Sequence, residues 1–138
     1  MFPPTTRILL AEDTEITRTV IHKMINKLGF TDVTLVADGR TATREIEAAM
    51  AAGKPFELII SDWNMPEETG LLLLKRVKKE PKTKHLPFIL LTSNNEKEQV
   101  LEAIRSGVTN YLSKPFSLEV LERKLKETWE LIQKKKVA

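Results

Sequence analysis

Short apolar runs alternate with amphipathic segments along the chain, and this alternation restricts the possible folds more than any other feature. The runs are rich in aliphatic and β-branched residues, which predicts buried strands. They cover residues 7–11, 32–36, 58–61, 88–92 and 110–113. The segments after them predict helices at about residues 14–28, 38–52, 70–79, 98–106 and 117–136. Five strand–helix repeats with short connections predict an α/β fold: a five-stranded parallel sheet, doubly wound, with five helices covering both faces.

The first and last predicted helices each carry a stripe of apolar residues. In the first helix, which Thr14 is placed to cap and Gly29 to end, the stripe that we expect to face the core consists of Ile16, Val20, Met24 and Leu28. In the last helix the corresponding stripe consists of Leu118, Leu121, Leu125, Trp129 and Ile132. Both stripes predict helices that lie on the sheet.

Length and composition restrict the class of protein. The 138 residues suffice for a single domain, 1–138, with a real core. The chain has no Cys and only two His, which excludes disulfides and thiolate metal sites and argues against a zinc centre. Apolar stretches such as residues 71–74 are far too short to span a membrane. Residues 1–6 lack the regions of a signal peptide, so we expect a loose N-terminal arm on a cytoplasmic protein.

Net charge is +3, and the predicted last helix, residues 117–136, is basic. A basic helix can attract nucleic acid or anionic lipid, but no patch of interleaved basic and aromatic residues and no DNA-reading motif accompanies this one. We therefore interpret it as a solvated helix face. Neither nucleic-acid binding nor membrane insertion is predicted.

Chemically useful side chains follow four of the predicted strands. Glu12 and Asp13 come after the first strand, Asp62 after the third, Thr92 at the end of the fourth and Lys114 after the fifth. Parallel strands bring their carboxyl ends to one edge, where ligands bind in this type of fold. Clustered carboxylates there suit Mg²⁺ or Mn²⁺, and an ammonium and a hydroxyl nearby suit phosphoryl transfer. Asp62 would then be the nucleophile that forms an aspartyl phosphate.

Each of these side chains also has a plainer interpretation. Asp62 alone could be an acidic turn residue, and Glu12 and Asp13 could be charges at a helix N-terminus. Thr92 could be an ordinary strand residue and Lys114 a surface lysine. Their joint occurrence, each after the appropriate strand, favours the functional interpretation.

Four motifs resemble the receiver domain of two-component response regulators, whose fold is flavodoxin-like. They are ILLAED at 8–13, SDWNMP at 61–66 followed by Gly70, LLTS at 90–93 and YLSKPF at 111–116. The resemblance extends over about residues 7–130 and is greatest to the single-domain chemotaxis members. It implies that Asp62 accepts a phosphoryl group from the phosphohistidine of a sensor kinase, in a self-catalysed reaction that is later reversed by water. It also implies a phosphoacceptor switch rather than an enzyme with a separate substrate.

The resemblance implies roles for the other strand-end residues. Mg²⁺ would be bound by Asp13 directly, by Glu12 through water, by Asp62, and by the backbone carbonyl of Asn64. The phosphoryl group would be contacted by Thr92 and Lys114, and Lys114–Pro115 would be a cis peptide. Tyr111 would be the switch aromatic that turns inward as Thr92 moves. Asn64 and Asn94 would tune the rate of dephosphorylation, and we expect turnover to change in Asn94→Glu.

The loop after Asp62 departs from the usual pattern of this family. After Pro66 the family usually has an apolar residue and then Asp or Asn before the glycine, whereas this chain has Glu68 and Thr69. Because this loop carries a metal ligand, metal affinity or loop geometry is expected to differ. Ser93 is larger than the small residue often found there and is expected to restrict access to Asp62.

Two other classes of protein were weighed against a receiver. A phosphatase or phosphotransferase of the haloacid dehalogenase type would have a second Asp where Asn64 stands, and Asn cannot serve as a general acid. A binding module that has lost phosphorylation would not retain the chemical positions named above. We expect no output domain after residue 138, so the signal is expected to leave by protein contact. We also expect the protein to be a monomer. Its expected partners are a sensor histidine kinase, a flagellar motor switch protein and possible phosphatases; the alternative is a relay that passes phosphate to a histidine phosphotransfer protein.

Overall fold

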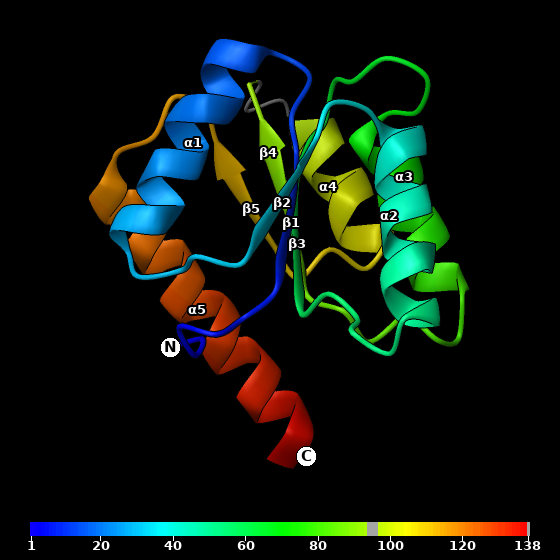
Figure 1. The fold of residues 1–138 in the computed structure, drawn as a ribbon. Helices are drawn as coiled ribbons and strands as arrows, with labels where there is room; N and C mark the ends of the chain where they lie inside the picture. Colours follow the sequence, from blue (N-terminus) through cyan, green and yellow to red (C-terminus); the bar gives the residue numbers. More distant parts are fainter. Residues whose placement is uncertain (94–96, 138) are drawn as a thin grey trace.

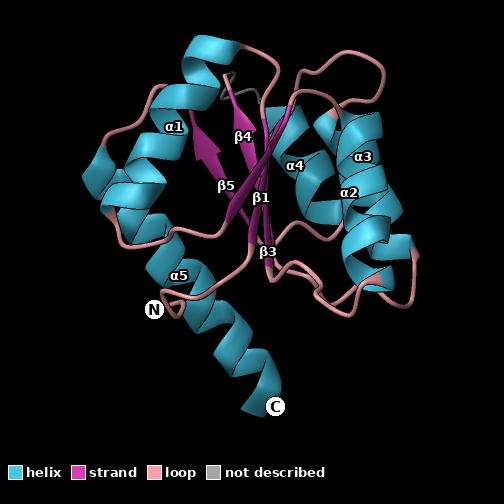
Figure 2. Ribbon diagram, viewed as in Figure 1, coloured by secondary structure: helices cyan, strands magenta, loops and turns pink. Residues whose placement is uncertain are grey.

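The strands form the parallel sheet that the sequence predicted. The structure is a computed structural model that describes residues 1–93 and 97–137. Within these residues five parallel strands form a sheet in the order β2-β1-β3-β4-β5 (Figures 1 and 2). Their bounds are β1 Ile8–Ala11, β2 Val33–Val36, β3 Leu58–Asp62, β4 Phe88–Thr92 and β5 Asn110–Ser113. Strands β1, β3 and β4 are buried along their whole length because helices cover both faces of the sheet.

Five helices in the described part of the chain form the outer layers. They are α1 Glu15–Lys27, α2 Gly39–Ala51, α3 Gly70–Lys79, α4 Lys97–Arg105 and α5 Leu118–Val137. Figure 1 shows α1 and α5 on one face of the sheet and α2, α3 and α4 on the other. Each face has its own apolar core, one built around Ile21, Ile25, Leu121 and Leu125 and the other around Ile46, Leu73 and Leu74. The predicted doubly wound fold is therefore confirmed.

Side chains cap three of the helices, whereas Thr14, the cap predicted for α1, makes no side-chain capping hydrogen bond. The Asp38 carboxylate accepts from the Thr41 N–H at 2.7 Å and caps α2. Thr69 caps α3, and the Ser117 hydroxyl accepts from Val120 N at 3.2 Å at the start of α5. These caps fix where each helix begins relative to the strand end before it. Among the residues described, no helix combines the length and apolar character needed to cross a membrane.

The core face of α1 differs from the prediction. Ile16 is 78% exposed and Val20 is 47% exposed, whereas Ile21 and Ile25 are buried against the sheet. Apolar residues lie on two adjacent faces of this helix, so periodicity alone did not determine which face turns inward. Met24 and Leu28, at the boundary between the faces, are half-buried. The predicted stripe was therefore wrong for its first two members.

The N-terminal arm, residues 1–6, is packed against the protein, whereas the sequence led us to expect a loose arm. Phe2 is 5% exposed, and its ring meets that of Trp129 edge-to-face with centroids 5.1 Å apart. Thr6 is also buried and donates its hydroxyl hydrogen bond to the Pro3 carbonyl at 2.6 Å. The physical reason is that α5 extends past the sheet edge and presents Trp129, whose apolar surface the arm covers. Figure 1 shows the N-terminus beside this helix.

Candidate functional site

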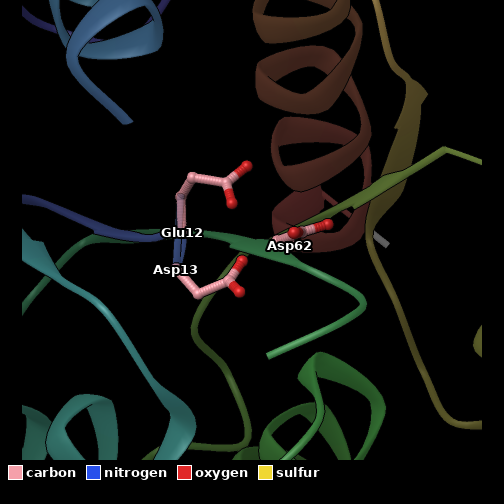
Figure 3. A group of neighbouring side chains, drawn as sticks. All are labelled: Glu12, Asp13 and Asp62. Carbon is pink, nitrogen blue, oxygen red and sulfur yellow. The ribbon is translucent and has the colours of Figure 1, made fainter. Parts of the chain in front are cut away.

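The register between β1 and β3 places the predicted acidic residues next to each other at the carboxyl edge of the sheet. Ala11 of β1 pairs with Ser61 of β3, so the following residues, Glu12 and Asp62, lie side by side at the carboxyl edge. Glu12 continues the sheet because its N–H donates to the Val36 carbonyl at 3.0 Å. The carboxylate oxygens of Glu12, Asp13 and Asp62 come within 4.8 Å of one another (Figure 3). The structure thus brings together the three carboxylates that the sequence predicted.

The three carboxylates differ in their exposure to solvent. Glu12 is fully buried and Asp62 is 5% exposed, while Asp13 is exposed. Buried carboxylates are costly unless they are paired or hydrogen-bonded. The site therefore requires compensating positive charge.

Lys114 supplies part of this charge. Its Nζ lies 2.7 Å from Glu12 Oε1 and 3.2 Å from Asp62 Oδ2, and its side chain is largely buried. The other Glu12 oxygen accepts from the Thr14 N–H at 3.2 Å. Three carboxylates and one ammonium leave a formal charge of −2 among these side chains, which one divalent cation would neutralise. Carboxylate oxygens with an exposed member are also the donor set that Mg²⁺ prefers, so these residues fit such an ion.

Two groups in the cluster have shifted pKa values. Although Asp13 is exposed, partial desolvation of its carboxyl group raises its pKa, and the adjacent Glu12 carboxylate raises it further. Burial works to lower the pKa of Lys114, but the hydrogen bond with Glu12 and the attraction of Asp62 outweigh burial and raise it. Lys114 therefore stays a charged ammonium over the physiological pH range. The repulsion between neighbouring carboxylates shows in the raised pKa of Asp13.

Thr92 lies at the end of β4, the strand next to β3, and Tyr111 lies within β5, two residues before its end. Thr92, buried at the end of β4, pairs in register with Ser113 of β5. Thr92, Tyr111 and Trp63 line a cavity of about 10 Å³ beneath α4. The half-buried ring of Tyr111 has the Lys124 ammonium 5.1 Å from its centroid. This cavity is far too small for the tyrosine ring, so an inward turn of Tyr111 would require Thr92 or α4 to move.

Two further predicted features lie on loops, at Asn64 and at the Lys114–Pro115 bond. Asn64 is exposed in the segment that connects β3 to α3. The two ends of that segment lie next to each other, because the Gly70 N–H donates to the Trp63 carbonyl at 2.8 Å. A Cβ atom at Gly70 would stand 2.0 Å from the Asp62 carbonyl oxygen, so the close approach requires glycine. The Lys114–Pro115 bond is cis, as the resemblance implied. Asn94 lies outside the described residues.

Arg18 belongs to the site although the sequence analysis did not single it out. From the first turn of α1, its Nη1 donates to the Glu12 carbonyl at 2.8 Å and reaches the Asp13 carbonyl at 3.5 Å. It thus holds the backbone from which both acidic side chains project. A basic residue one turn into the helix after an acidic pair was the available signal.

Comparison with known proteins identifies the family. The sequence profile of the response regulator receiver domain matches residues 8–126. The chain belongs to this family. Chemotaxis protein CheY of Pseudomonas aeruginosa is 33% identical over 126 residues, which are 91% of this chain and 98% of that protein. Chemotaxis protein CheY1 of Helicobacter pylori is 34% identical over 119 residues, which are 86% of this chain and 93% of that protein.

Solved receiver structures share the fold. The structure of Vibrio cholerae chemotaxis protein CheY4 superposes with a TM-score of 0.80 at 31% identity, covering 90% of this chain and 98% of that one. The receiver domain of a Pseudomonas aeruginosa sensor histidine kinase superposes with a TM-score of 0.78 at 30% identity, covering 94% and 98%. That structure has a magnesium ion coordinated in its active-site cleft. The receiver resemblance seen in the sequence is thereby confirmed.

Proposed function

We propose that this receiver is a chemotaxis-type response regulator that accepts a phosphoryl group on Asp62 from a sensor histidine kinase. The observation that carries the proposal is the position of Asp62: a largely buried carboxylate at a strand end, 3.2 Å from the Lys114 ammonium and next to two further carboxylates. Such an arrangement can stabilise the charge that spreads over phosphoryl oxygens during transfer. The similarity to CheY proteins favours chemotaxis over a role as a relay intermediate.

The residues of the site would divide the chemistry between them. An Asp62 oxygen forms the new bond to phosphorus as the bond from phosphorus to the kinase histidine nitrogen breaks, and that nitrogen keeps the electron pair. Lys114 and the Thr92 hydroxyl contact the transferred oxygens, and water later cleaves the acyl phosphate. Asp13, Glu12, Asp62 and the Asn64 carbonyl would hold Mg²⁺, with Mn²⁺ as a possible substitute. When bound, the ion supplies positive charge that screens the carboxylates from the incoming phosphoryl group.

A groove beside the site supports a protein as the phosphoryl donor. It has a volume of about 330 Å³ and runs between α1 and the β5–α5 connection, ending at Lys114. Val20, Met24 and Phe116 give it an apolar lining. The exposure of Val20, which the sequence did not predict, fits an approach surface for a cytoplasmic kinase better than a free solvent face.

The output would follow from a two-state switch. Phosphate on Asp62 would draw Thr92 and Lys114 toward it, Tyr111 would turn inward, and the surface of α4, β5 and α5 would change for a partner. A flagellar motor switch protein is the proposed partner. Asn64 and Asn94 are the proposed determinants of the rate of reset.

Phosphorylation can be tested directly. The protein is incubated with Mg²⁺ and a small acyl phosphate, and its intact mass is measured. We expect a gain of one phosphoryl group that disappears in Asp62→Asn and persists in the matched control Asp32→Asn, because Asp32 lies at the opposite end of the sheet. A gain that persists in Asp62→Asn would place the acceptor elsewhere. Retention of a motor switch protein by the phosphorylated form only would support chemotaxis.

A further inference from the structure

Glu68, one of the two departures from the family pattern, is held from two sides. Its carboxylate forms an ion pair with Arg76 of α3, and its side chain is 17% exposed. Its backbone packs against the first residue of α2: a Cβ atom at Gly39 would stand 2.6 Å from both the Cβ and the carbonyl oxygen of Glu68. Residue 68 is therefore fixed between two helices.

The turn that leads into Glu68 has an unfavourable backbone conformation. Glu67 has φ = 69°, and the Glu68 N–H donates to the Pro66 carbonyl at 2.8 Å across it. An i to i+2 hydrogen bond across a residue with positive φ is a rare, strained form of the γ-turn. Such conformations persist only where surrounding contacts hold them. The Glu67 carboxylate contributes little to this, because its contact with Arg40 is 3.9 Å long and both side chains are more than half exposed.

The same loop carries the proposed main-chain metal ligand. It leaves the site at Asp62, passes Asn64 and returns through Gly70, whose N–H donates to the Trp63 carbonyl at 2.8 Å. Because both ends are tied to β3, a shift at residue 68 must be taken up by the few residues between. Asn64 is among them.

We propose that Glu68 is a positioning residue for the metal site. Its pairing with Arg76 and its packing on Gly39 hold the strained loop in the conformation that presents the Asn64 carbonyl to a cation at Asp13 and Asp62. The inference rests on the proposed function, because it concerns the Mg²⁺ that this function requires. It assigns control of metal affinity to an ion pair outside the carboxylate cluster.

The test is a titration of the unphosphorylated protein with Mg²⁺ alone. The buried Trp63 adjoins Asp62, so its fluorescence reports on binding; the second of the two tryptophans is removed as Trp129→Phe in every variant. We expect Glu68→Gln and Arg76→Met to weaken Mg²⁺ binding by about tenfold, the lower end of the effect of losing groups that orient metal ligands. Arg76→Lys, which keeps a cation, is expected to weaken it less than Arg76→Met.

Two comparisons separate positioning from simple electrostatics. Arg76→Met removes a positive charge, which by itself would strengthen the binding of a cation, so unchanged or tighter binding in this variant would overturn the inference. Glu67→Gln is the matched control, since it removes the same charge one residue away and is expected to change affinity less than about twofold. Equal weakening by Glu67→Gln and Glu68→Gln would also overturn it.

Failure of the inference can be told apart from failure of the proposed function. If the parent protein binds no Mg²⁺, the proposed metal role is wrong and the inference falls with it. If the parent binds Mg²⁺ and all variants bind it equally, only the positioning role of Glu68 is wrong. Thermal unfolding of each variant establishes that it is folded at the temperature of the titration.

Discussion

Replacing Lys114 by Met should destabilise the metal-free protein strongly. The substitution keeps much of the apolar stem but leaves the buried Glu12 and Asp62 carboxylates without their ammonium partner, which lies 2.7 and 3.2 Å from them. At an effective dielectric constant of about 20, Coulomb attraction at these distances is about 5–6 kcal/mol for each pair before desolvation is subtracted. Removing one partner of a buried ion pair typically costs about 3–5 kcal/mol, and we adopt about 3 kcal/mol.

This loss corresponds to a clear shift in the unfolding temperature. An unfolding entropy of about 2.1 cal/mol/K per residue gives about 290 cal/mol/K for the 138 residues. A loss of about 3 kcal/mol therefore lowers Tm by about 10 °C. The assay is thermal unfolding followed by circular dichroism at neutral pH with a chelator present. Added Mg²⁺ should narrow the difference if it binds the folded site, because a ligand of the native state raises Tm and a cluster without the Lys114 ammonium attracts the cation more strongly than the parent cluster does.

Two controls decide whether the cause is the ion pair. Lys23→Met removes the same charge from an exposed position of α1 and should change stability by less than about 0.5 kcal/mol. In a Glu12→Gln background, Lys114→Met should cost about 2 kcal/mol less than in the parent, since its closest partner is already neutral. Equal costs in both backgrounds, or a Tm close to that of Lys23→Met, would refute the reasoning.

Three further predictions concern stability. The raised pKa of Asp13 means that the folded state holds this proton more tightly than the unfolded chain does, so ionisation of Asp13 destabilises the fold. Without Mg²⁺, Asp13→Asn should therefore raise Tm at neutral pH. That gain should shrink as pH falls through the raised pKa toward the ordinary value of 3.8, and a gain independent of pH would contradict the assignment. Phe2→Ala should lower Tm by roughly 7 °C, about 2 kcal/mol, through loss of the contact with Trp129, whereas an unchanged Tm would show a loose arm. Gly70→Ala should lower the free energy of unfolding by more than about 2 kcal/mol, because its methyl group would stand 2.0 Å from the Asp62 carbonyl oxygen. The loss is measured as a lower midpoint of urea unfolding, and an unchanged midpoint would mean that α3 shifts freely.

The sequence predicted the sheet and the carboxylate cluster well because both depend on local signals. Buried parallel strands are apolar throughout, and Asp62 marks the end of β3 because a charge ends such a run. Once the strands are parallel, their carboxyl ends must share an edge. The closeness of Glu12, Asp62 and Lys114 to one another then follows from the topology of the sheet, although these residues are far apart in sequence.

What could not be predicted depends on side chains that reach between elements. The exposed face of α1 was misplaced because apolar residues occupy two of its faces, and only packing on the sheet selects Ile21 and Ile25. The arm was misplaced because its partner, Trp129, lies at the other end of the chain. Arg18 was missed because its partners are backbone carbonyls, which are present at every residue, so its place one turn after the acidic pair was a weak signal.

The contacts of Glu12 indicate how the three carboxylates share their tasks. Both of its oxygens are used within the protein, one by Lys114 at 2.7 Å and the other by the Thr14 N–H at 3.2 Å. Asp13 is exposed, and the contact of Asp62 with Lys114 is longer, at 3.2 Å. We therefore expect a cation that enters from solvent to meet Asp13 and Asp62 first, while Glu12 holds Lys114 in place. On this division of tasks we predict that Glu12 contacts a metal only through water, because both of its oxygens already have partners in the protein.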